Sequence, residues 1–384
     1  MTWQDHSGLL DKLEAGLGER GALWFTTNPG LEDIVADELS ERLSVAGIDA
    51  TTLEVERKPL GFSGNVIVLL PNLDVDVERA ACELRSVHHV VRPLYGFDLS
   101  PAEDEALDVI ATQLTARGVP ALEADGLTSF RVTSRRSGTH PFTSVDVQRR
   151  AGAALVDRYG LGVDLEKPDC EVRVDVIGTR CLVGVQITRE SLSRRKQRRY
   201  NPRGAVKSNV AYTMLRFAGL SVGRILDPFC GSATIPIEAA QVYPDLNIEA
   251  SDYSERAVEG ARQNVEAADL NQRIDVFCRD VADLPEHHPA DRFDAIVTNP
   301  PFGVRIGRGM NFLTFYSRFL DVAAHLLKPG GRLVFLVWKR GVIDRANRPH
   351  NRFRRNHVRV VETGGIFPRI YVFEKRVDKQ DLTL

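Results

Sequence analysis

The sequence predicts an α/β protein, with a doubly wound parallel sheet in its carboxyl-terminal part and α+β organisation before it. Three observations support this prediction. After residue 205, strand-like and helix-like patterns alternate as repeated βα units do. Before residue 188, strands and helices mix without strict alternation, which favours α+β. Between these parts, residues 189–207 hold eight basic residues and one acid, hence a local net charge of +7, which indicates a linker or a contact surface.

The first region, residues 21–95, has the pattern of a compact α+β unit. A short β-like run leads through an Asn-Pro-Gly turn into a helix whose apolar residues recur at helical spacing over 31–43. A strand at 65–70 and a helix at 77–91 follow. Residues 1–20 form an N-terminal extension, and the acidic residues among its leucines distinguish it from a secretory signal.

The second region, residues 96–188, is also predicted to be α+β. It has a helix at 102–117, an alternating strand that begins "SFRVT", an amphipathic helix and a β-hairpin around the Gly178 turn. The basic linker at 189–207 follows. The last region, residues 208–384, then carries the βα alternation, for which a parallel sheet with ligands at the strand carboxyl ends is expected.

Length and composition describe an ordinary globular protein of two or three domains. Of its 384 residues, 43% are apolar and 27% are charged, and the net charge of −2 gives no global basic field. No run approaches the roughly 18 apolar residues that a membrane span needs. The five cysteines are scattered and lack metal-ligand spacing, so we expect reduced thiols in a cytoplasmic protein and no metal site.

Acidic residues end three successive strands of the last region. Asp227 lies in "LDPFCGSAT", where a strand runs through a Gly-bearing turn into a helix; this turn lacks the Walker and dinucleotide spacings. Asp227 could orient an amine, Asp252 could accept from ribose hydroxyls, and Asp280 could accept from the amine of an adenine. Singly, each is as well explained by a structural turn, a solvated strand end or a helix cap. Three together favour a nucleoside ligand.

The stretch "NPPF" closes the fourth strand of the same sheet. Proline removes a backbone donor and fixes φ, so Pro300 and Pro301 stop the strand and stiffen its end. The Asn299 side-chain oxygen and the Pro300 carbonyl are two acceptors suited to the two N–H bonds of an exocyclic amine. Phe302 offers a flat face on which a base could stack.

These motifs resemble those of class I S-adenosylmethionine-dependent methyltransferases that act on exocyclic amines, over residues 224–339. The resemblance implies a Rossmann-like domain, S-adenosylmethionine as cofactor, and in-line methyl transfer to nitrogen. It implies catalytic roles for Asn299, Pro300, Pro301 and Phe302. It implies cofactor contacts from Asp227, Phe229, Gly231, Ser232, Ala233, Thr234, Asp252, Tyr253, Asp280, Val281 and Asn299. Cys230 lies in the Gly-bearing turn of "LDPFCGSAT", here called the cofactor loop, rather than after the two prolines. We therefore expect Cys230 to be a packing residue and not a nucleophile.

The upstream chain also resembles known modules. The "FRV" strand, the "HPFTS" turn and the "KPD" before a strand, all within 96–188, are similar to a THUMP RNA-binding domain. The block with "TTNPGLEDIV" is similar to the ferredoxin-like domain that precedes THUMP. The end, "RVVETGGIFPRIYVFEK" at 359–375, resembles the tRNA guanine-N2 methyltransferases whose target is guanosine 6 of the acceptor stem.

That family implies tRNA as partner, held at its acceptor stem and 3′ end, with N2-methylguanosine as product and a flipped target base. A monomer is expected. Basic residues around the linker and the THUMP region would contact phosphates, although a solvated surface charge is the usual explanation of any single arginine. They are Arg135, Arg136, Arg194, Arg195, Lys196, Arg198 and Arg199.

Two departures and three alternatives remain. Ala233 stands where the family commonly has a second glycine, and Phe302 replaces the commoner tyrosine. The target could instead be guanosine 10 of tRNA or a guanosine in ribosomal or small nuclear RNA. A protein of another class, a THUMP RNA-binding protein without catalysis, is the third alternative, and the intact strand-end acids argue against it.

Overall fold

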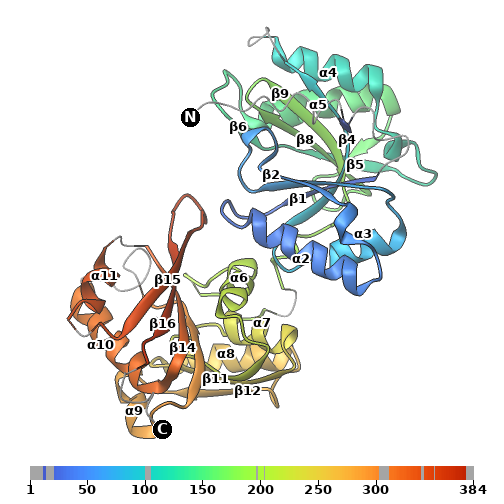
Figure 1. The fold of residues 1–384 in the computed structure, drawn as a ribbon. Coiled ribbons are helices and arrows are strands. Elements are labelled where there is room, and N and C mark those ends of the chain that lie inside the picture. Colours follow the sequence, from blue (N-terminus) through green and yellow to red (C-terminus); the bar gives the residue numbers. More distant parts are fainter. Residues whose placement is uncertain are drawn as a thin grey trace. The chain divides into compact units, whose positions relative to one another are not determined.

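A computed structural model describes residues 12–13, 21–99, 105–195, 198–202, 204–301, 311–338, 341–349 and 351–377. The chain divides into two compact units, Met1–Leu192 and Ser193–Leu384 (Figure 1). None of the described helices combines the length and the apolar composition that a membrane span requires.

The first unit is built on one mixed sheet. Its strands are β1 (Gly21–Thr26), β2 (Glu54–Arg57), β3 (Asn65–Leu70), β4 (His89–Asp98), β5 (Ser129–Thr133), β6 (Arg136–Ser137), β7 (Gly162–Val163), β8 (Cys170–Ile177) and β9 (Arg180–Gln186). They are ordered β2-β3-β1-β4-β9-β8-β5-β7, and β6 pairs with β8. The β8–β9 pair is the antiparallel hairpin that the sequence predicts around Gly178.

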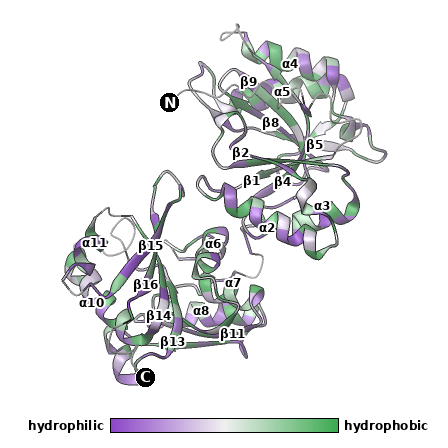
Figure 2. Ribbon diagram, viewed as in Figure 1, coloured by the Kyte–Doolittle hydropathy of each residue, from purple (hydrophilic) through white to green (hydrophobic). Residues whose placement is uncertain are grey.

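Helices bury the apolar side chains of this sheet. They are α2 (Glu32–Val45), α3 (Val75–Cys82), α4 (Ala106–Arg117) and α5 (Ser144–Tyr159). Leu23 and Phe25 of β1 share one core with α2 and α3, whereas Phe130 of β5 and Val174 of β8 share another with α4 and α5. Figure 2 shows the hydrophobic strands and the alternating faces of α4.

The expected helix over residues 77–91 is wrong beyond Cys82, because β4 begins at His89 and occupies the middle of the sheet. β4 pairs with β1 on one side and β9 on the other, and these tertiary partners fix its extended conformation. The expected domain boundary between residues 95 and 96 therefore falls inside a strand. The division of this unit into two domains stays a prediction.

The second unit has a seven-stranded sheet. Its strands are β10 (Val222–Asp227), β11 (Asp245–Asp252), β12 (Ile274–Cys278), β13 (Phe293–Thr298), β14 (Leu327–Val337), β15 (Phe353–Val360) and β16 (Arg369–Lys375). The order is β12-β11-β10-β13-β14-β16-β15. The first five are parallel, and β16 is antiparallel to both β14 and β15. This sheet confirms the predicted Rossmann-like α/β class.

Helices cover both faces of this second sheet (Figure 1). They are α6 (Ser208–Ala218), α7 (Thr234–Val242), α8 (Glu255–Ala267), α9 (Leu284–His287), α10 (Phe312–Leu326) and α11 (Val342–Asn347). The sequence does not predict β15, because β15 is an edge strand whose side chains, except that of Phe353, are largely accessible to solvent. An edge strand with little apolar alternation gives no clear sequence pattern, so its pairing is seen only in the tertiary structure.

Candidate active site

A cavity of about 530 Å³ opens at the carboxyl ends of the parallel strands in the second unit. In a doubly wound fold, ligands bind at this edge, because helix N-termini and loop backbone meet there. The cavity brings together all three predicted strand-end acids and the first three residues of the "NPPF" motif. Its other lining residues are Tyr200, Pro202, Gly204, Ala205, Val206, Pro228, Phe229, Cys230, Gly231, Ser232, Thr234, Ile235, Tyr253, Ser254, Ala257, Val281 and Phe315.

Asp227, the last residue of β10, is almost fully buried beside this cavity. One of its oxygens, Oδ1, accepts hydrogen bonds from the Thr298 hydroxyl at 2.6 Å and from the Phe229 N–H at 3.2 Å. Burial nevertheless raises its pKa to about 7, because two donors do not replace the lost water, and the charge of Asp252 acts in the same direction. A cation bound here would restore the ionised carboxylate.

Asp252 ends β11 and holds the loop that follows β10. Its Oδ2 accepts from the Gly231 N–H at 3.1 Å and its Oδ1 from the Ser254 N–H at 3.0 Å. Burial raises the pKa of this carboxyl. Asp280, beyond the end of β12, is exposed and accepts from the Ala282 N–H at 2.9 Å, so one of its oxygens caps a turn.

The loop after β10 takes two left-handed residues, Gly231 at φ 53° and Ala233 at φ 58°. Glycine adopts this region freely, whereas the Cβ of alanine makes it strained. Ala233 is fully buried at the start of α7, so the departure noted in the sequence lies in a strained position. Cys230 is buried and burial raises the pKa of its thiol well above the usual value, as expected for a packing residue.

Asn299 presents an unused acceptor to the cavity. Its Nδ2 donates to the Gly204 carbonyl at 3.2 Å. Its Oδ1 is buried and has no hydrogen-bond partner within the described part of the chain. Buried polar atoms without partners are rare in folded proteins, and one beside a cavity indicates a donor supplied by a ligand.

The two prolines of the "NPPF" motif contact the cavity, and the second of them also contacts α10. Pro300 and Pro301 line the cavity, and the Pro301 carbonyl accepts from the buried Tyr316 hydroxyl of α10 at 3.0 Å. Phe302 lies outside the described residues. Another aromatic ring, Phe315, does line the cavity and packs on Phe229 with ring centroids 5.7 Å apart.

The basic linker is partly built into the second unit. Arg195 forms a two-bond ion pair with the buried carboxylate of Glu238 in α7, at 2.6 and 3.0 Å. Arg198 donates to the Thr234 hydroxyl at the start of α7. Arg194 and Arg199 are exposed, whereas Lys196 lies outside the described residues. Of the predicted phosphate contacts in this segment, two arginines therefore already have partners inside the unit.

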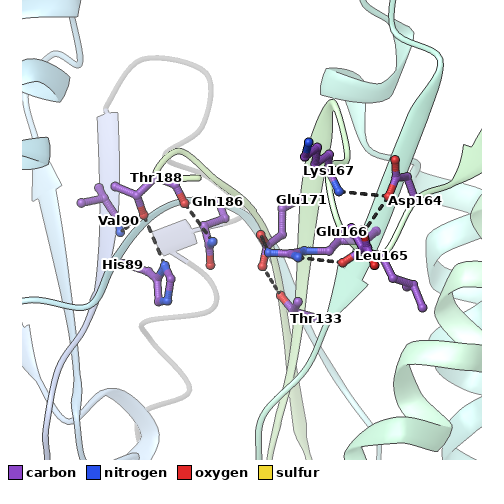
Figure 3. Close-up of polar contacts among 11 residues, drawn as sticks. His89, Val90, Thr133, Asp164, Leu165, Glu166, Lys167, Glu171, Gln186 and Thr188 are labelled. Atoms are coloured by element: carbon purple, nitrogen blue, oxygen red, sulfur yellow. Dashed lines mark hydrogen bonds and ion pairs between the residues drawn. The ribbon is translucent and has the colours of Figure 1, made fainter. Parts of the chain in front are cut away.

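Several arginines of the first unit likewise have partners inside the protein. Arg173 of β8 forms a buried ion pair with Asp175, and Glu171 accepts from Arg131. Glu171 also accepts from Thr133 of β5 at 3.0 Å (Figure 3). Arg136 lies 2.8 Å from the ring of His140. Of the two predicted arginines in this unit, Arg135 is exposed and Arg136 is half-buried.

Figure 3 also shows polar contacts between the start of β4 and the residues at the end of β9. The Thr188 hydroxyl lies 3.4 Å from His89 Nδ1, and its carbonyl accepts from Gln186 at 2.9 Å. Burial, followed by the charge of Arg173, lowers the pKa of His89 to about 4, so this ring is neutral at pH 7. These contacts stabilise the unit and add no cation to its surface.

Four residues that the sequence did not single out complete the site. Thr298 holds Asp227, Gly204 orients Asn299, and Tyr316 fixes Pro301. Asn264 of α8 bonds to both the linker and the cofactor loop. No local sequence signal identifies them, because each acts on a partner that is far away in the chain.

Two family models match the chain: "RMKL-like, methyltransferase domain" over residues 195–368 and "THUMP domain" over residues 109–186. A tRNA (guanine(6)-N2)-methyltransferase of Thermus thermophilus is 38% identical over 357 residues, which cover 92% of this chain and all of that protein. The crystal structure of TrmN from Thermus thermophilus superposes with a TM-score of 0.75 at 36% identity, covering 92% of this chain and 99% of that one. A mouse U6 snRNA (guanine-N(2))-methyltransferase, THUMPD2, is 30% identical over 62% of this chain and 45% of its own length.

Proposed function

Because the chain belongs to the THUMP-domain tRNA guanine-N2 methyltransferase family, we propose that it methylates the exocyclic N2 of a guanosine in tRNA. The product is N2-methylguanosine and the methyl donor is S-adenosylmethionine. The target is guanosine 6 of the acceptor stem, since the relative that bears this name is matched along its whole length. We also propose that the enzyme is cytoplasmic, in keeping with its five free cysteines, and that it acts as a monomer.

The observation that carries this proposal is the buried, unpartnered Oδ1 of Asn299. An exocyclic amine has two N–H bonds, and an acceptor without a donor is the complement that such an amine needs. The Gly204 carbonyl holds the other end of the amide, which fixes the oxygen toward the ligand. An ionised carboxylate has no donor for this acceptor, and a ribose hydroxyl has a single O–H, whereas an amine can donate to Asn299 Oδ1 and to a second acceptor at once.

The cavity suits the cofactor in size and in the order of its polar groups. We assign the carboxylate of Asp227 to the ammonium of the methionine part, Asp252 to the ribose hydroxyls, and Asp280 with Val281 to the adenine. The loop from Phe229 to Thr234 would contact the cofactor at the start of α7. The N–H groups of Phe229 and Gly231 already donate to Asp227 and Asp252, so we assign Ser232 and Thr234 as the backbone donors. Bound there, S-adenosylmethionine supplies an electrophilic methyl group.

In the proposed mechanism, the protein contributes orientation and charge stabilisation. Asn299 Oδ1 and the Pro300 carbonyl accept the two N–H bonds of guanine N2 and direct its lone pair toward the cofactor side of the cavity. The same two acceptors stabilise the positive charge that develops on this nitrogen. One of the two amine protons then passes to solvent, which gives neutral N2-methylguanosine. Phe302 is assigned to stacking on the flipped base.

The exposed arginines are assigned to the RNA backbone. Arg135, Arg194 and Arg199 are the described members of the predicted set with exposed side chains, so they are the first choices for phosphate contacts. Arg136, Arg195 and Arg198 already bond within the protein and are assigned weaker contributions. The THUMP unit would grip the 3′ end, and the target base would leave its pair to reach Asn299.

The test is to incubate the purified protein with labelled S-adenosylmethionine and unmodified tRNA transcripts, then map N2-methylguanosine by position. Product at position 6 supports the whole proposal, whereas product at position 10 retains the chemistry and reassigns the target. A U6 small nuclear RNA transcript in a parallel reaction tests the substrate named for the mouse relative. Cofactor binding without product on any of these RNAs would contradict the proposed substrate and point to a different RNA or a missing partner subunit. Absence of cofactor binding would contradict the proposal as a whole and favour a non-catalytic RNA-binding role.

A further inference from the structure

The segment that enters the second unit packs directly on the cofactor site. We call residues 198–202 and 204–206 the strap. Tyr200, Pro202 and the residues from Gly204 to Val206 line the 530 Å³ cavity. A linker that only spans two domains needs no such contacts, so the strap is one wall of the site.

The side-chain amide of Asn264 in α8 makes four hydrogen bonds, three to the strap and one to the cofactor loop. Its Oδ1 accepts from the N–H groups of Arg199 at 2.7 Å and Tyr200 at 2.8 Å. Its Nδ2 donates to the carbonyl of Tyr200 at 2.8 Å and to the carbonyl of Ser232 at 2.9 Å. Asn264 is 1% exposed, so water does not compete for these bonds. One amide thus joins the strap to the cofactor loop.

A second contact seats the strap on the same helix. An ideal Cβ on Gly260 would lie 2.2 Å from Cδ1 of Tyr200, which is far inside van der Waals contact. The tyrosine ring therefore occupies space that only a glycine leaves open. Gly260 precedes Asn264 by one helical turn, so the two residues share a face of α8.

The other end of the strap reaches the catalytic motif. The Gly204 carbonyl accepts from Asn299 Nδ2 at 3.2 Å. This bond determines which end of the amide is the acceptor inside the cavity, and it leaves Oδ1 buried and unpartnered. The position of Gly204 in turn depends on where the strap is anchored four residues earlier.

We infer that Asn264 is a positioning residue, which locks the strap onto the cofactor loop and through Gly204 sets the orientation of the Asn299 amide. Asn264 contacts neither substrate nor cofactor in this role. It couples cofactor binding, through Ser232, to substrate orientation, through Asn299. The inference deepens the proposed function and rests on it for the turnover measurement, but not for the binding measurement.

The first experiment compares Asn264→Ala with Gln263→Ala, an exposed amide on the same helix. Trypsin reports on the strap, because Arg199 is an exposed cleavage site within it. We expect Asn264→Ala to raise the rate of cleavage after Arg199, and to raise the dissociation constant for S-adenosylhomocysteine about tenfold by calorimetry. A role limited to stability would lower the Tm and leave both quantities unchanged in the folded protein.

The second variant, Gly260→Ala, displaces the Tyr200 ring without touching Asn264. Alanine favours the helix itself, so this variant keeps the fold if Asn264→Ala does not. The same rise in cleavage and in the dissociation constant is expected, whereas wild-type values in this folded variant would overturn the inference.

Turnover then separates the inference from the proposed function. With unmodified tRNA, we expect both variants to lose about 100-fold in kcat, since a small misplacement of the reacting groups is enough to do so. If the wild type makes no N2-methylguanosine, the proposed function fails. The binding and cleavage results still decide the role of Asn264 in that case.

Discussion

Asp169 in the first unit and Asp227 in the second both belong to motifs that the sequence singles out, yet their surroundings are opposite. Asp169 Oδ2 accepts from the N–H and hydroxyl groups of both Thr128 and Ser129, at 2.9 to 3.1 Å. These bonds, with the Thr128 N–H first, lower the pKa of Asp169 to about 2. Burial raises the pKa of Asp227 to about 7.

The same contrast extends to the neighbouring motif residues. Thr143 of the "HPFTS" turn and Asp146 in the first turn of α5 cap that helix reciprocally, and Phe142 packs in the core. In the "NPPF" motif, Asn299 keeps one buried acceptor without a partner. Motif residues of the first unit therefore satisfy each other and build the fold, whereas those of the second unit are held with spare bonding capacity for a ligand.

The largest expected effect tests that spare capacity. Asn299→Ala should lower methyl transfer about 100- to 1000-fold, because it removes an acceptor that stabilises developing charge. Cofactor affinity should change little. The measurements are single-turnover kinetics on tRNA and calorimetry with S-adenosylhomocysteine. Asn271→Ala, an exposed turn residue, is the control, and full turnover in Asn299→Ala would contradict the assigned role.

The second prediction concerns pH and Asp227. The carboxyl must be ionised to attract the cofactor ammonium, and burial holds its pKa at about 7. We therefore expect affinity for S-adenosylhomocysteine to rise about tenfold per pH unit below pH 7, where the ammonium stays protonated. Calorimetry between about pH 5.5 and 7 measures it. A pH-independent affinity in the wild type would contradict this.

Asp227→Asn is the matched control, since it should bind weakly at every pH in that window. The effect of Asp227 on protein stability changes with pH in the opposite direction to its effect on cofactor affinity. The folded pKa of Asp227 is raised above the ordinary value of 3.8, so this group stabilises the cofactor-free protein most at low pH. That contribution is lost as the pH rises from about 4 through about 7.

The third prediction addresses the satisfied aspartate. Asp169→Ala should lower the Tm of the first unit, because Thr128 and Ser129 lose their common acceptor. Differential scanning calorimetry measures the Tm, with the exposed Asp125→Ala as control. Cofactor affinity should remain that of the wild type. If Asp169→Ala lost cofactor binding without a change in Tm, Asp169 would serve ligand binding rather than the fold, which would contradict the contrast between the two units.

The smallest expected effect compares two left-handed positions. Gly160 ends α5 at φ 66° with open space around its missing Cβ, and Ala233 begins α7 at φ 58°. Gly160→Ala should destabilise the protein by about 1 kcal/mol, and Ala233→Gly should stabilise it by a similar or smaller amount. Denaturant unfolding followed by circular dichroism measures both. If Gly160→Ala and Ala233→Gly changed the free energy of unfolding in the same direction, backbone strain would not be the cause of both changes.

Much of the second unit was predictable because its signals are local. The strand-end acids and the "NPP" stop follow directly from the order of strands in a doubly wound sheet, and the structure brings them around one cavity. The strand β4 and the edge strand β15 were not predictable in this way. Their conformations depend on partners elsewhere in each sheet.

The sequence alone determined the fold class and the chemistry that the strand ends can offer, because both depend on short-range patterns of apolar residues, prolines and acids. Only the tertiary structure decided how those groups are held. Asn299 depends on Gly204, 95 residues away, and Ser232 is joined to Asn264, 32 residues away. It also showed that Arg195 is paired with Glu238, 43 residues on, rather than left for a ligand. Such bonds form between positions whose spacing in the chain carries no signal, since folding alone brings them within hydrogen-bonding distance.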